Sequence, residues 1–278
     1  KCGVVEKAQE VFENIPFSDV ICWNSLIFGY ALNGFGEEAR QGIKLMLEQG
    51  VLPSIVTYTS ILKGCGRGGL IKTGEDMHME VFKRGLFGKD ILLSNSLVDM
   101  YAKLSLLVKA KEVFDELPLR NVVSWNSLIS GYVQNGLSHE ALSYFEKMKD
   151  DEGINPNAIT YVCMLKACGS TGSLKVGEEI HVEVNRQGLL QKDIMLGTAL
   201  VDMYAKCGVL EKAQEVFEDL PNRNVVTWSA LIAGYTRNRL GNEALICFRR
   251  MQDEGISPNA VTFICILKAC GSTESIHI

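Results

Sequence analysis

The chain has 278 residues, 47% of them hydrophobic and 22% charged, and its formal net charge is −5. This composition predicts a globular protein with a continuous core. No apolar run reaches the roughly 18 residues of a membrane helix, so we expect no membrane partner. The acidic balance argues against the coating of a nucleic-acid duplex by positive charge, although it allows a local basic stripe.

Cysteine is frequent, with nine residues, but its pattern is that of a repeat. Cys163 and Cys168 recur as Cys265 and Cys270. Because the total is odd and no Cys-x-x-Cys pair occurs, we predict reduced, buried thiols in a reducing compartment, with neither disulfides nor metal ligation.

A segment of nine residues occurs three times, at 22–30, 124–132 and 227–235. In each copy Trp, Leu, Ile and Tyr stand at positions i, i+3, i+4 and i+7, which places them on one buried stripe of a helix. A small polar residue follows each Trp, beside the stripe but outside it. The copies lie 102 and 103 residues apart, so the chain is predicted to be a repeat array.

Each long repeat divides into three predicted helix-turn-helix units of 35 or 36, 36 and 31 residues. The first kind closes on a turn with Gly and Pro, which end its second helix and prevent its continuation. No strand-like alternation occurs, and one helix pair cannot bury both of its faces. We therefore predict an all-α solenoid of stacked pairs. The first kind covers residues 20–54, 122–157 and 225–259, the second 55–90 and 158–193, and the third 91–121 and 194–224. Partial copies are expected at 1–19 and 260–278, so the chain is expected to be a section of a longer array.

Three motifs carry a resemblance to a known family. They are Trp-Asn-Ser-Leu-Ile-x-Gly-Tyr-x-x-Asn-Gly at 125–136, the segment 161–184 with Leu-Lys-Ala-Cys-Gly and Gly-Glu-Glu-Ile-His, and Leu-Val-Asp-Met-Tyr-Ala-Lys-Cys-Gly at 200–208. They resemble the standard (P), long (L) and short (S) motifs of the plant PLS subclass of pentatricopeptide repeat proteins. The resemblance spans the chain and implies a right-handed superhelix that binds single-stranded RNA, one base per repeat. The deaminase-like DYW domain that often follows such arrays is not expected in this chain.

By resemblance, the fifth residue of the first helix and the last residue of each motif together contact one base edge, while the second residue packs on base faces. The edge pairs are Asn24/Ser54, Thr59/Asp90, Asn95/Asn121, Asn126/Asn157, Val162/Asp193, Thr198/Asn224 and Ser229/Asn259. The second residues are Ile21, Val56, Leu92, Val123, Ile159, Met195 and Val226. Ordinary packing between helices is the alternative interpretation of these seven apolar residues.

The edge pairs predict a target sequence. A carboxylate only accepts hydrogen bonds and suits the N–H of G or U, whereas an amide can donate to the ring acceptor of A or C. By resemblance, Thr or Ser with Asn favours A, Thr with Asp favours G, and Asn with Asn or Ser favours C over U. Val162 forms no hydrogen bond. The predicted RNA is C-G-Y-Y-N-A-A, where Y is C or U and N is any base.

Four lysines, Lys63, Lys103, Lys166 and Lys206, are spaced to lie near the base-reading stripe, where they could contact phosphates. Asp99 and Asp202 are predicted on the same face. A solvated charged face is the alternative interpretation of these lysines.

Two His-x-Glu pairs, His78 with Glu80 and His181 with Glu183, are like those of zinc deaminases. That site also requires Pro-Cys-x-x-Cys, and no proline here is followed by cysteine. We therefore expect no catalytic residues, no metal and no cofactor.

The resemblance implies a role in organellar RNA processing, in the mitochondrion or the chloroplast, most directly as the recognition factor for C-to-U editing sites. Implied partners are single-stranded RNA, multiple organellar RNA editing factor proteins, and a deaminase supplied in trans. The alternative is a helical protein-interaction scaffold like the tetratricopeptide arrays, whose 34-residue period does not match these units.

Overall fold

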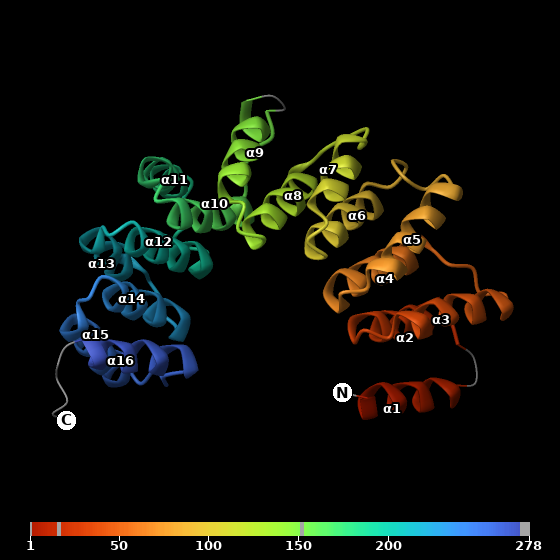
Figure 1. The fold of residues 1–278 in the computed structure, drawn as a ribbon, viewed down its shortest axis with the longest axis horizontal. Coiled ribbons are helices and arrows are strands. Elements are labelled where there is room, and N and C mark those ends of the chain that lie inside the picture. The colour runs from red at the N-terminus through yellow and green to blue at the C-terminus, as the bar shows by residue number, and fades with distance from the viewer. Residues whose placement is uncertain (1, 16–17, 151–152, 273–278) are drawn as a thin grey trace. The chain divides into compact units, whose positions relative to one another are not determined.

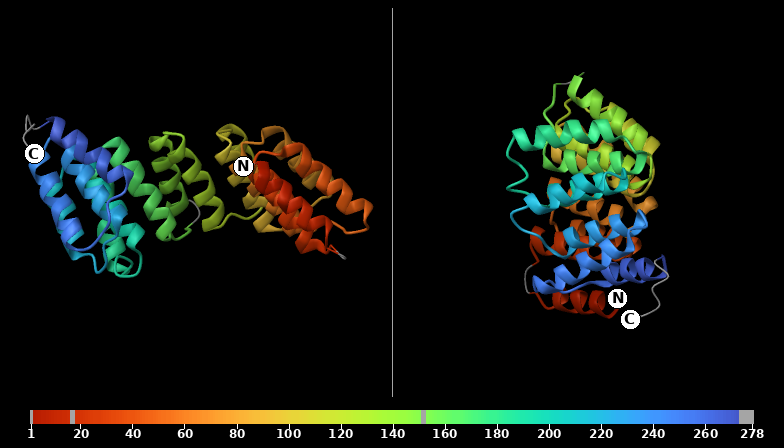
Figure 2. Two further views of the ribbon diagram at one scale, coloured as in Figure 1. Left: turned by 90° about the horizontal axis from the view of Figure 1, so that it is seen from below. Right: turned by 90° about the vertical axis from the view of Figure 1, so that its left-hand side faces the viewer.

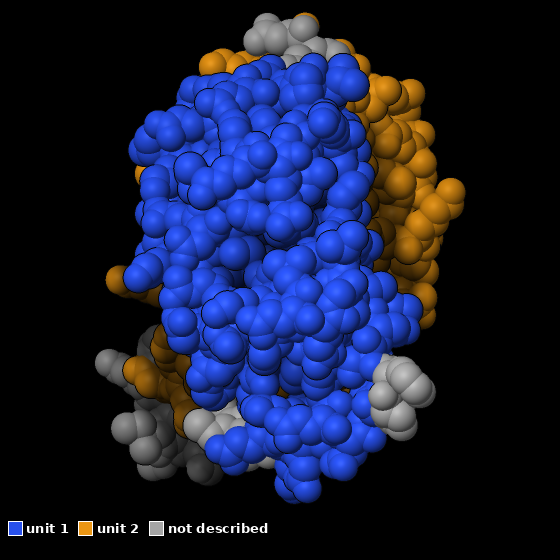
Figure 3. Space-filling model, turned by 90° about the vertical axis from the view of Figure 1, so that its right-hand side faces the viewer, with its two compact units in different colours: residues 1–135 blue, residues 136–278 orange. Residues whose placement is uncertain are grey.

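The structure is a computed structural model that describes residues 2–15, 18–150 and 153–272. These residues form sixteen α-helices and no strand, which confirms the predicted all-α class. The chain divides into two compact units, residues 1–135 and 136–278, coloured separately in Figure 3.

Unit 1 holds eight helices among its described residues. They are α1 (Cys2–Glu13), α2 (Val20–Leu32), α3 (Gly36–Glu48), α4 (Ile55–Gly68), α5 (Ile71–Lys83), α6 (Ile91–Lys103), α7 (Leu107–Asp115) and α8 (Val122–Gln134). Within this unit α2 packs on α4, α4 on α6, and α6 on α8, so the first helices of successive pairs form one continuous layer (Figure 1).

Unit 2 repeats this arrangement in its described part. Its helices are α9 (Ser138–Asp150), α10 (Ala158–Thr171), α11 (Leu174–Arg186), α12 (Ile194–Lys206), α13 (Leu210–Asp219), α14 (Val225–Arg237), α15 (Gly241–Asp253) and α16 (Ala260–Ser272). Here α10, α12, α14 and α16 are the stacked first helices, and they lie side by side in Figures 1 and 2. Each unit is thus a stack of helical hairpins, as expected of a repeat solenoid.

The repeated nine-residue segment forms the middle of α2, α8 and α14, and its apolar stripe faces the core. Trp125, Leu128, Ile129 and Tyr132 are all buried, as the periodicity predicts. Each Trp also contacts a Phe from the helix before it, edge to face. The ring centroids are 4.6 Å apart for Phe12–Trp23, 4.8 Å for Phe114–Trp125 and 4.5 Å for Phe217–Trp228. Such pairs contribute about 0.5–1.5 kcal/mol of stability in addition to that from burying apolar area. They therefore stabilise the packing of one repeat on the next.

The predicted glycine turns are confirmed where the structure describes them. Gly50 and Gly255 follow α3 and α15 with φ of 77° and 75°, a left-handed conformation that a residue with a Cβ rarely adopts.

Eight of the cysteines, those from Cys22 to Cys270, are free thiols. Burial raises the pKa of Cys65 and of Cys168 to about 12, which keeps both protonated and unreactive at neutral pH. None of the described helices is both long and apolar enough to cross a membrane.

Candidate nucleic-acid interface

The second residues of the first helices are exposed apolar side chains. Their exposed fractions lie between 48% and 68%, so these side chains do not fill the space between helices. The seven are Ile21, Val56, Leu92, Val123, Ile159, Met195 and Val226. Packing between helices therefore accounts for only part of the surface of each side chain. Seven apolar residues at one repeat position form exposed surface along the first helices.

The last residues of the motifs are N-caps of the helices that follow. Asp90 Oδ1 accepts from the N–H of Leu93 at 2.8 Å, and Asn121 Oδ1 accepts from Val123 and Ser124 at 3.0 Å. Ser54, Asn157, Asp193, Asn224 and Asn259 bond to the starts of α4, α10, α12, α14 and α16 in the same way. Capping needs a short polar side chain at the first turn of a helix. Local chemistry thus fixes each of these residues at the same edge of its repeat.

The fifth residues lie beside these caps and are mostly buried. Asn24, Thr59, Asn95, Asn126, Val162 and Ser229 expose between 4% and 8% of their surface, while Thr198 is half-buried. Three of them, in successive repeats of unit 1, hold a buried polar atom with no partner among the described residues. These atoms are Asn24 Oδ1, Thr59 Oγ1 and Asn95 Oδ1. A buried polar atom without a hydrogen-bond partner costs about 1–3 kcal/mol of stability relative to one that has a partner. The recurrence of such atoms at one repeat position suggests that a ligand supplies the missing hydrogen bonds.

The structure brings together the two residues of several predicted pairs. Asn95 Nδ2 donates to Asn121 Oδ1 at 3.2 Å. A hydrogen-bonded threonine, Thr227, joins Thr198 to Asn224.

Thr262 joins Ser229 to Asn259 in the same way. Among the described residues no hydrogen bond joins Asn24 to Ser54 or Thr59 to Asp90. Asn126 belongs to unit 1 and Asn157 to unit 2, so each of these two residues is placed only within its own unit.

A hollow of about 490 Å³ in unit 2 collects several of these positions. Its lining includes Val162, Met195, Thr198, Asn224, Val226 and Ser229, together with Lys166 and Asp202. Polar atoms of the fifth and last residues thus open into the same space as the exposed apolar second residues. That combination is what a flat ring with a hydrogen-bonding edge requires.

The four lysines differ in their surroundings. Lys103 Nζ lies 2.5 Å from Asp99 Oδ2, so its charge is largely neutralised within α6. Lys206 is paired with Asp202 in α12 in the same way, at 2.6 Å. Lys63 is exposed, and no carboxylate in the described part of the chain pairs with it.

Lys166 has the same setting as Lys63 and lines the hollow. The four lysines are therefore not equivalent. Lys63 and Lys166 carry an ammonium group that no carboxylate of the described residues pairs with, and that group is available to bind a phosphate.

The histidines of the two His-x-Glu pairs bond to tyrosines of the next first helix. His78 Nδ1 is 2.8 Å from the hydroxyl of Tyr101, and His181 Nδ1 is 2.9 Å from that of Tyr204. Burial lowers the pKa of both histidines, and nearby Lys109 and Lys212 add to the effect. No group of three or more His, Cys, Asp or Glu within the described ranges is placed to hold a metal ion.

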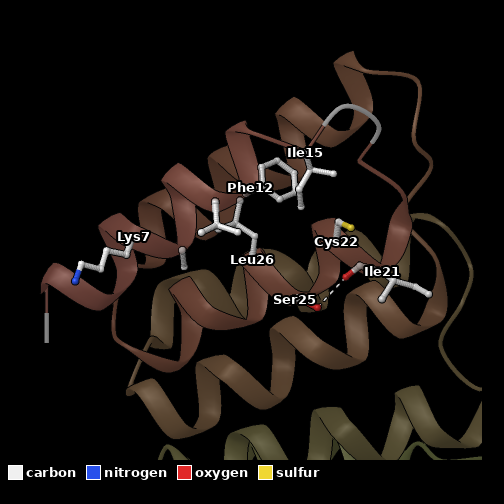
Figure 4. Close-up of a pocket in the computed structure, with 9 residues that line it drawn as sticks. Lys7, Phe12, Ile15, Ile21, Cys22, Ser25 and Leu26 are labelled. Atoms are coloured by element: carbon white, nitrogen blue, oxygen red, sulfur yellow. Dashed lines mark hydrogen bonds between the residues drawn. The ribbon is translucent and has the colours of Figure 1, made fainter.

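A second hollow, of about 480 Å³, lies between α1 and α2 and is almost wholly apolar (Figure 4). Phe12 and Leu26 line it, and neighbouring Val11 is 64% exposed. Val113, the equivalent residue of α7, is only 4% exposed because α6 packs beside it. The hollow is thus an apolar depression between α1 and α2, and its residues offer little polar chemistry.

Sequence reasoning missed two groups of residues at this interface. Val261 is the second residue of α16, is exposed, and lines the hollow of unit 2. Extending the period of 102 or 103 residues past Ile159 would have found it. Thr227 and Thr262 were missed because the hydroxyl of a helix's third residue is an ordinary capping feature.

These features define an α-helical repeat protein whose hairpins each carry variable residues along one edge. The sequence profile of the PPR repeat family matches residues 18–67, 120–170 and 223–272, and that of the PPR repeat matches 56–86, 93–122 and 198–225. The chain belongs to the pentatricopeptide repeat family.

Relatives and solved structures agree with this assignment. A chloroplastic pentatricopeptide repeat-containing protein of Arabidopsis thaliana is 36% identical over 274 residues, which cover 99% of this chain and 44% of the relative. A mitochondrial one from the same plant is 37% identical over 278 residues, covering 100% and 40%. The crystal structure of the pentatricopeptide repeat protein PPR10 in complex with an 18-nt psaJ RNA element has a similar fold. The TM-score is 0.75 at 21% identity, over 97% of this chain and 40% of that chain. The chain thus spans less than half the length of these proteins.

Proposed function

We propose that this chain binds single-stranded RNA and reads one base with each helix pair through the fifth and last residues. The observation that carries the proposal is the set of buried, unpartnered polar atoms on Asn24, Thr59 and Asn95. Each belongs to a first helix that also presents an exposed apolar second residue. A base satisfies both features at once, because its edge forms hydrogen bonds and its faces are apolar.

The exposed second residues clamp the faces of the bases. Stacking on an aromatic platform contributes about 1–3 kcal/mol per base, and the aliphatic residues of this chain give less per nucleotide. Specificity therefore depends on the edge contacts, and affinity grows with the number of repeats engaged.

The target of the complete repeats is C-G-Y-Y-N-A-A, 5′ to 3′. The two A positions belong to Thr198/Asn224 and Ser229/Asn259, and the unspecified position belongs to Val162, whose side chain has no polar atom. Lys63 and Lys166 contact phosphates, because they are the members of the lysine set without a paired carboxylate.

The proposed cellular role is supported by the resemblance to P, L and S motifs, and the proposed localisation by relatives named as chloroplastic or mitochondrial. We place the protein in one of these organelles, as the recognition factor for C-to-U editing, with catalysis by a deaminase in the remainder of the protein or in trans. Editing-factor proteins are its proposed protein partners. The test is to sequence organellar transcripts from plants that lack the parent gene. One cytidine near the predicted motif should stay unedited, and normal editing of all such sites would contradict this role.

Binding itself is tested by titrating the chain with a labelled RNA that contains the predicted motif and with a scrambled RNA of the same composition. We expect tighter binding of the motif, and the difference should persist as salt is raised because edge contacts are short-ranged. Equal affinity for both RNAs at every salt concentration would contradict the proposal that the chain recognises the base sequence of the RNA. It would favour the alternative, a scaffold for protein partners.

A further inference from the structure

A hydrogen-bond relay joins the fifth residue to the cap residue in unit 2. Thr198 Oγ1 lies 2.8 Å from Thr227 Oγ1, and the hydroxyl of Thr227 donates to Asn224 Oδ1 at 3.2 Å. Thr227 is fully buried and is the third residue of α14.

The next repeat has the same relay. Ser229 Oγ lies 2.8 Å from Thr262 Oγ1, whose hydroxyl donates to Asn259 Oδ1 at 3.0 Å. Thr262 is also fully buried, and it too is the third residue of its helix, α16. Two successive repeats of unit 2 therefore carry the same relay.

The relay fixes the direction of every proton in it. Asn224 Oδ1 can only accept, and it already accepts the backbone N–H of Val226 and of Thr227. Thr227 Oγ1 lies 3.2 Å from this oxygen, and a hydroxyl proton between the two atoms avoids repulsion between their lone pairs, so Thr227 donates to Asn224. Either hydroxyl can donate across the 2.8 Å between Thr198 and Thr227, and with the proton of Thr227 on Asn224 the donor there is Thr198.

Each relay consequently offers a defined pattern to a ligand. The hydroxyl of Thr198 or Ser229 keeps only acceptor lone pairs, and the cap asparagine offers its Nδ2 as a donor. Adenine and cytosine carry the complementary pattern, with an exocyclic amino donor beside a ring acceptor. Guanine and uracil carry the reverse, an exocyclic oxygen beside a ring N–H.

The repeats capped by aspartate lack the relay. Leu93 and Leu196 stand at the third position of α6 and α12, after Asp90 and Asp193. Without a hydroxyl there, Thr59 Oγ1 has no partner in the described part of the chain and can turn its proton outward. A carboxylate acceptor beside a free hydroxyl donor is the pattern that fits guanine.

We propose that Thr227 and Thr262 are positioning residues that set base choice, by taking the proton of Thr198 or Ser229 and leaving an acceptor beside the amide donor. The inference rests on the proposed function and extends it from the two residues that contact the base to a third that does not.

The test uses the 278-residue chain and four RNAs that differ only at the sixth nucleotide of the predicted motif, the one assigned to Thr198 and Asn224. The unmodified chain should bind the A and C oligonucleotides more tightly than the G and U ones. In Thr227→Val the preference for A over G should fall about tenfold, because the Thr198 hydroxyl can now donate to the guanine oxygen. Thr227→Ser should keep the preference, since it keeps the hydroxyl.

Thr236→Val is the matched control. It makes the same change in the same helix, at a hydroxyl that bonds only to backbone carbonyls. It should leave the A over G ratio unchanged, and circular dichroism should show both valine variants folded. If Thr227→Val does not fold, Thr262→Val read at the seventh nucleotide takes its place.

A folded Thr227→Val chain with the full preference for A would overturn the relay and leave RNA reading intact. An unmodified chain without base preference at any nucleotide would overturn the proposed function itself.

Discussion

At the scale of single residues, equivalent positions carry different constraints in different repeats. Gly29, Gly131 and Gly234 occupy the same position of the nine-residue segment in α2, α8 and α14. A Cβ on Gly234 would lie 2.5 Å from the Cβ of Ala205 in α12, whereas one on Gly29 would meet no atom within 4 Å. The glycine is thus required only where another first helix packs closely against it.

This difference predicts that alanine substitutions at the two glycines change the free energy of unfolding in opposite directions. Gly234→Ala should lower the free energy of unfolding by about 1–3 kcal/mol, because the new methyl group overpacks the junction of α12 and α14. Gly29→Ala should raise it by about 0.5–1 kcal/mol, because alanine has the better helix propensity and the space is open. Denaturant unfolding of the two variants measures both effects, and a change of the same sign in both would contradict this account of the junction.

A second residue-scale prediction concerns base choice at Thr198. Thr198→Asn should shift the preference at the sixth nucleotide from A toward C. The longer amide can donate to the cap, as Asn95 does to Asn121, and leaves room for a smaller base. Competition between the A and C oligonucleotides measures the shift. An unchanged preference for A would mean that the assignment of this pair to the sixth nucleotide is wrong.

At the scale of the elements, the first helices carry the proposed interface, and ion pairs between second helices join successive pairs. Arg40 of α3 pairs with Asp76 of α5 at 2.7 Å, and Arg250 of α15 pairs with Glu218 of α13 at 2.8 Å. These ion pairs are partly exposed and contribute less than about 1 kcal/mol each. The buried aromatic contacts and the His–Tyr hydrogen bonds between neighbouring pairs are less accessible to solvent.

The two half-buried histidines, His78 and His181, predict a pH dependence of stability. Burial holds the folded-state pKa of His78 and His181 below the ordinary 6.5, so the unfolded chain binds protons more readily. Stability should therefore be complete above about pH 6.5 and fall as pH drops through that value toward the lower folded-state pKa. In the His78→Asn/His181→Asn variant, unfolding measured over the same pH range should show a smaller loss. An equal loss in both proteins would assign the effect to other groups.

At the scale of the whole molecule, a chain of net charge −5 must bind a polyanion through a few local contacts. Lys103 and Lys206 are each paired with an aspartate of their own helix, which leaves Lys63 of α4 and Lys166 of α10.

This distribution predicts the salt dependence of RNA binding. The variant Lys63→Ala/Lys166→Ala should reduce the slope of log K against log salt by about 1.4, since each phosphate contact on a single strand contributes about 0.7. The control Lys72→Ala/Lys175→Ala removes the same charge from the second helices α5 and α11 and should leave the slope nearly unchanged. Equal slopes in the two variants would show that only net charge matters.

The sequence by itself determined the helices, their pairing into hairpins and the edge on which the variable residues lie. These features follow from local rules: a period of 3.6 residues, glycine after a helix, and a short polar cap before one. Asn121 caps α8 whatever packs beside it, so its position at the start of the helix could be predicted from the local sequence.

Only the tertiary structure decided which side chains meet. It showed that the apolar second residues are exposed, that Lys103 is paired and Lys63 is not, and that Thr227 touches Thr198 from a helix that starts 27 residues further along the chain. These contacts depend on the close approach of one first helix to the next. That spacing is set by the packing of whole repeats, which no local pattern encodes.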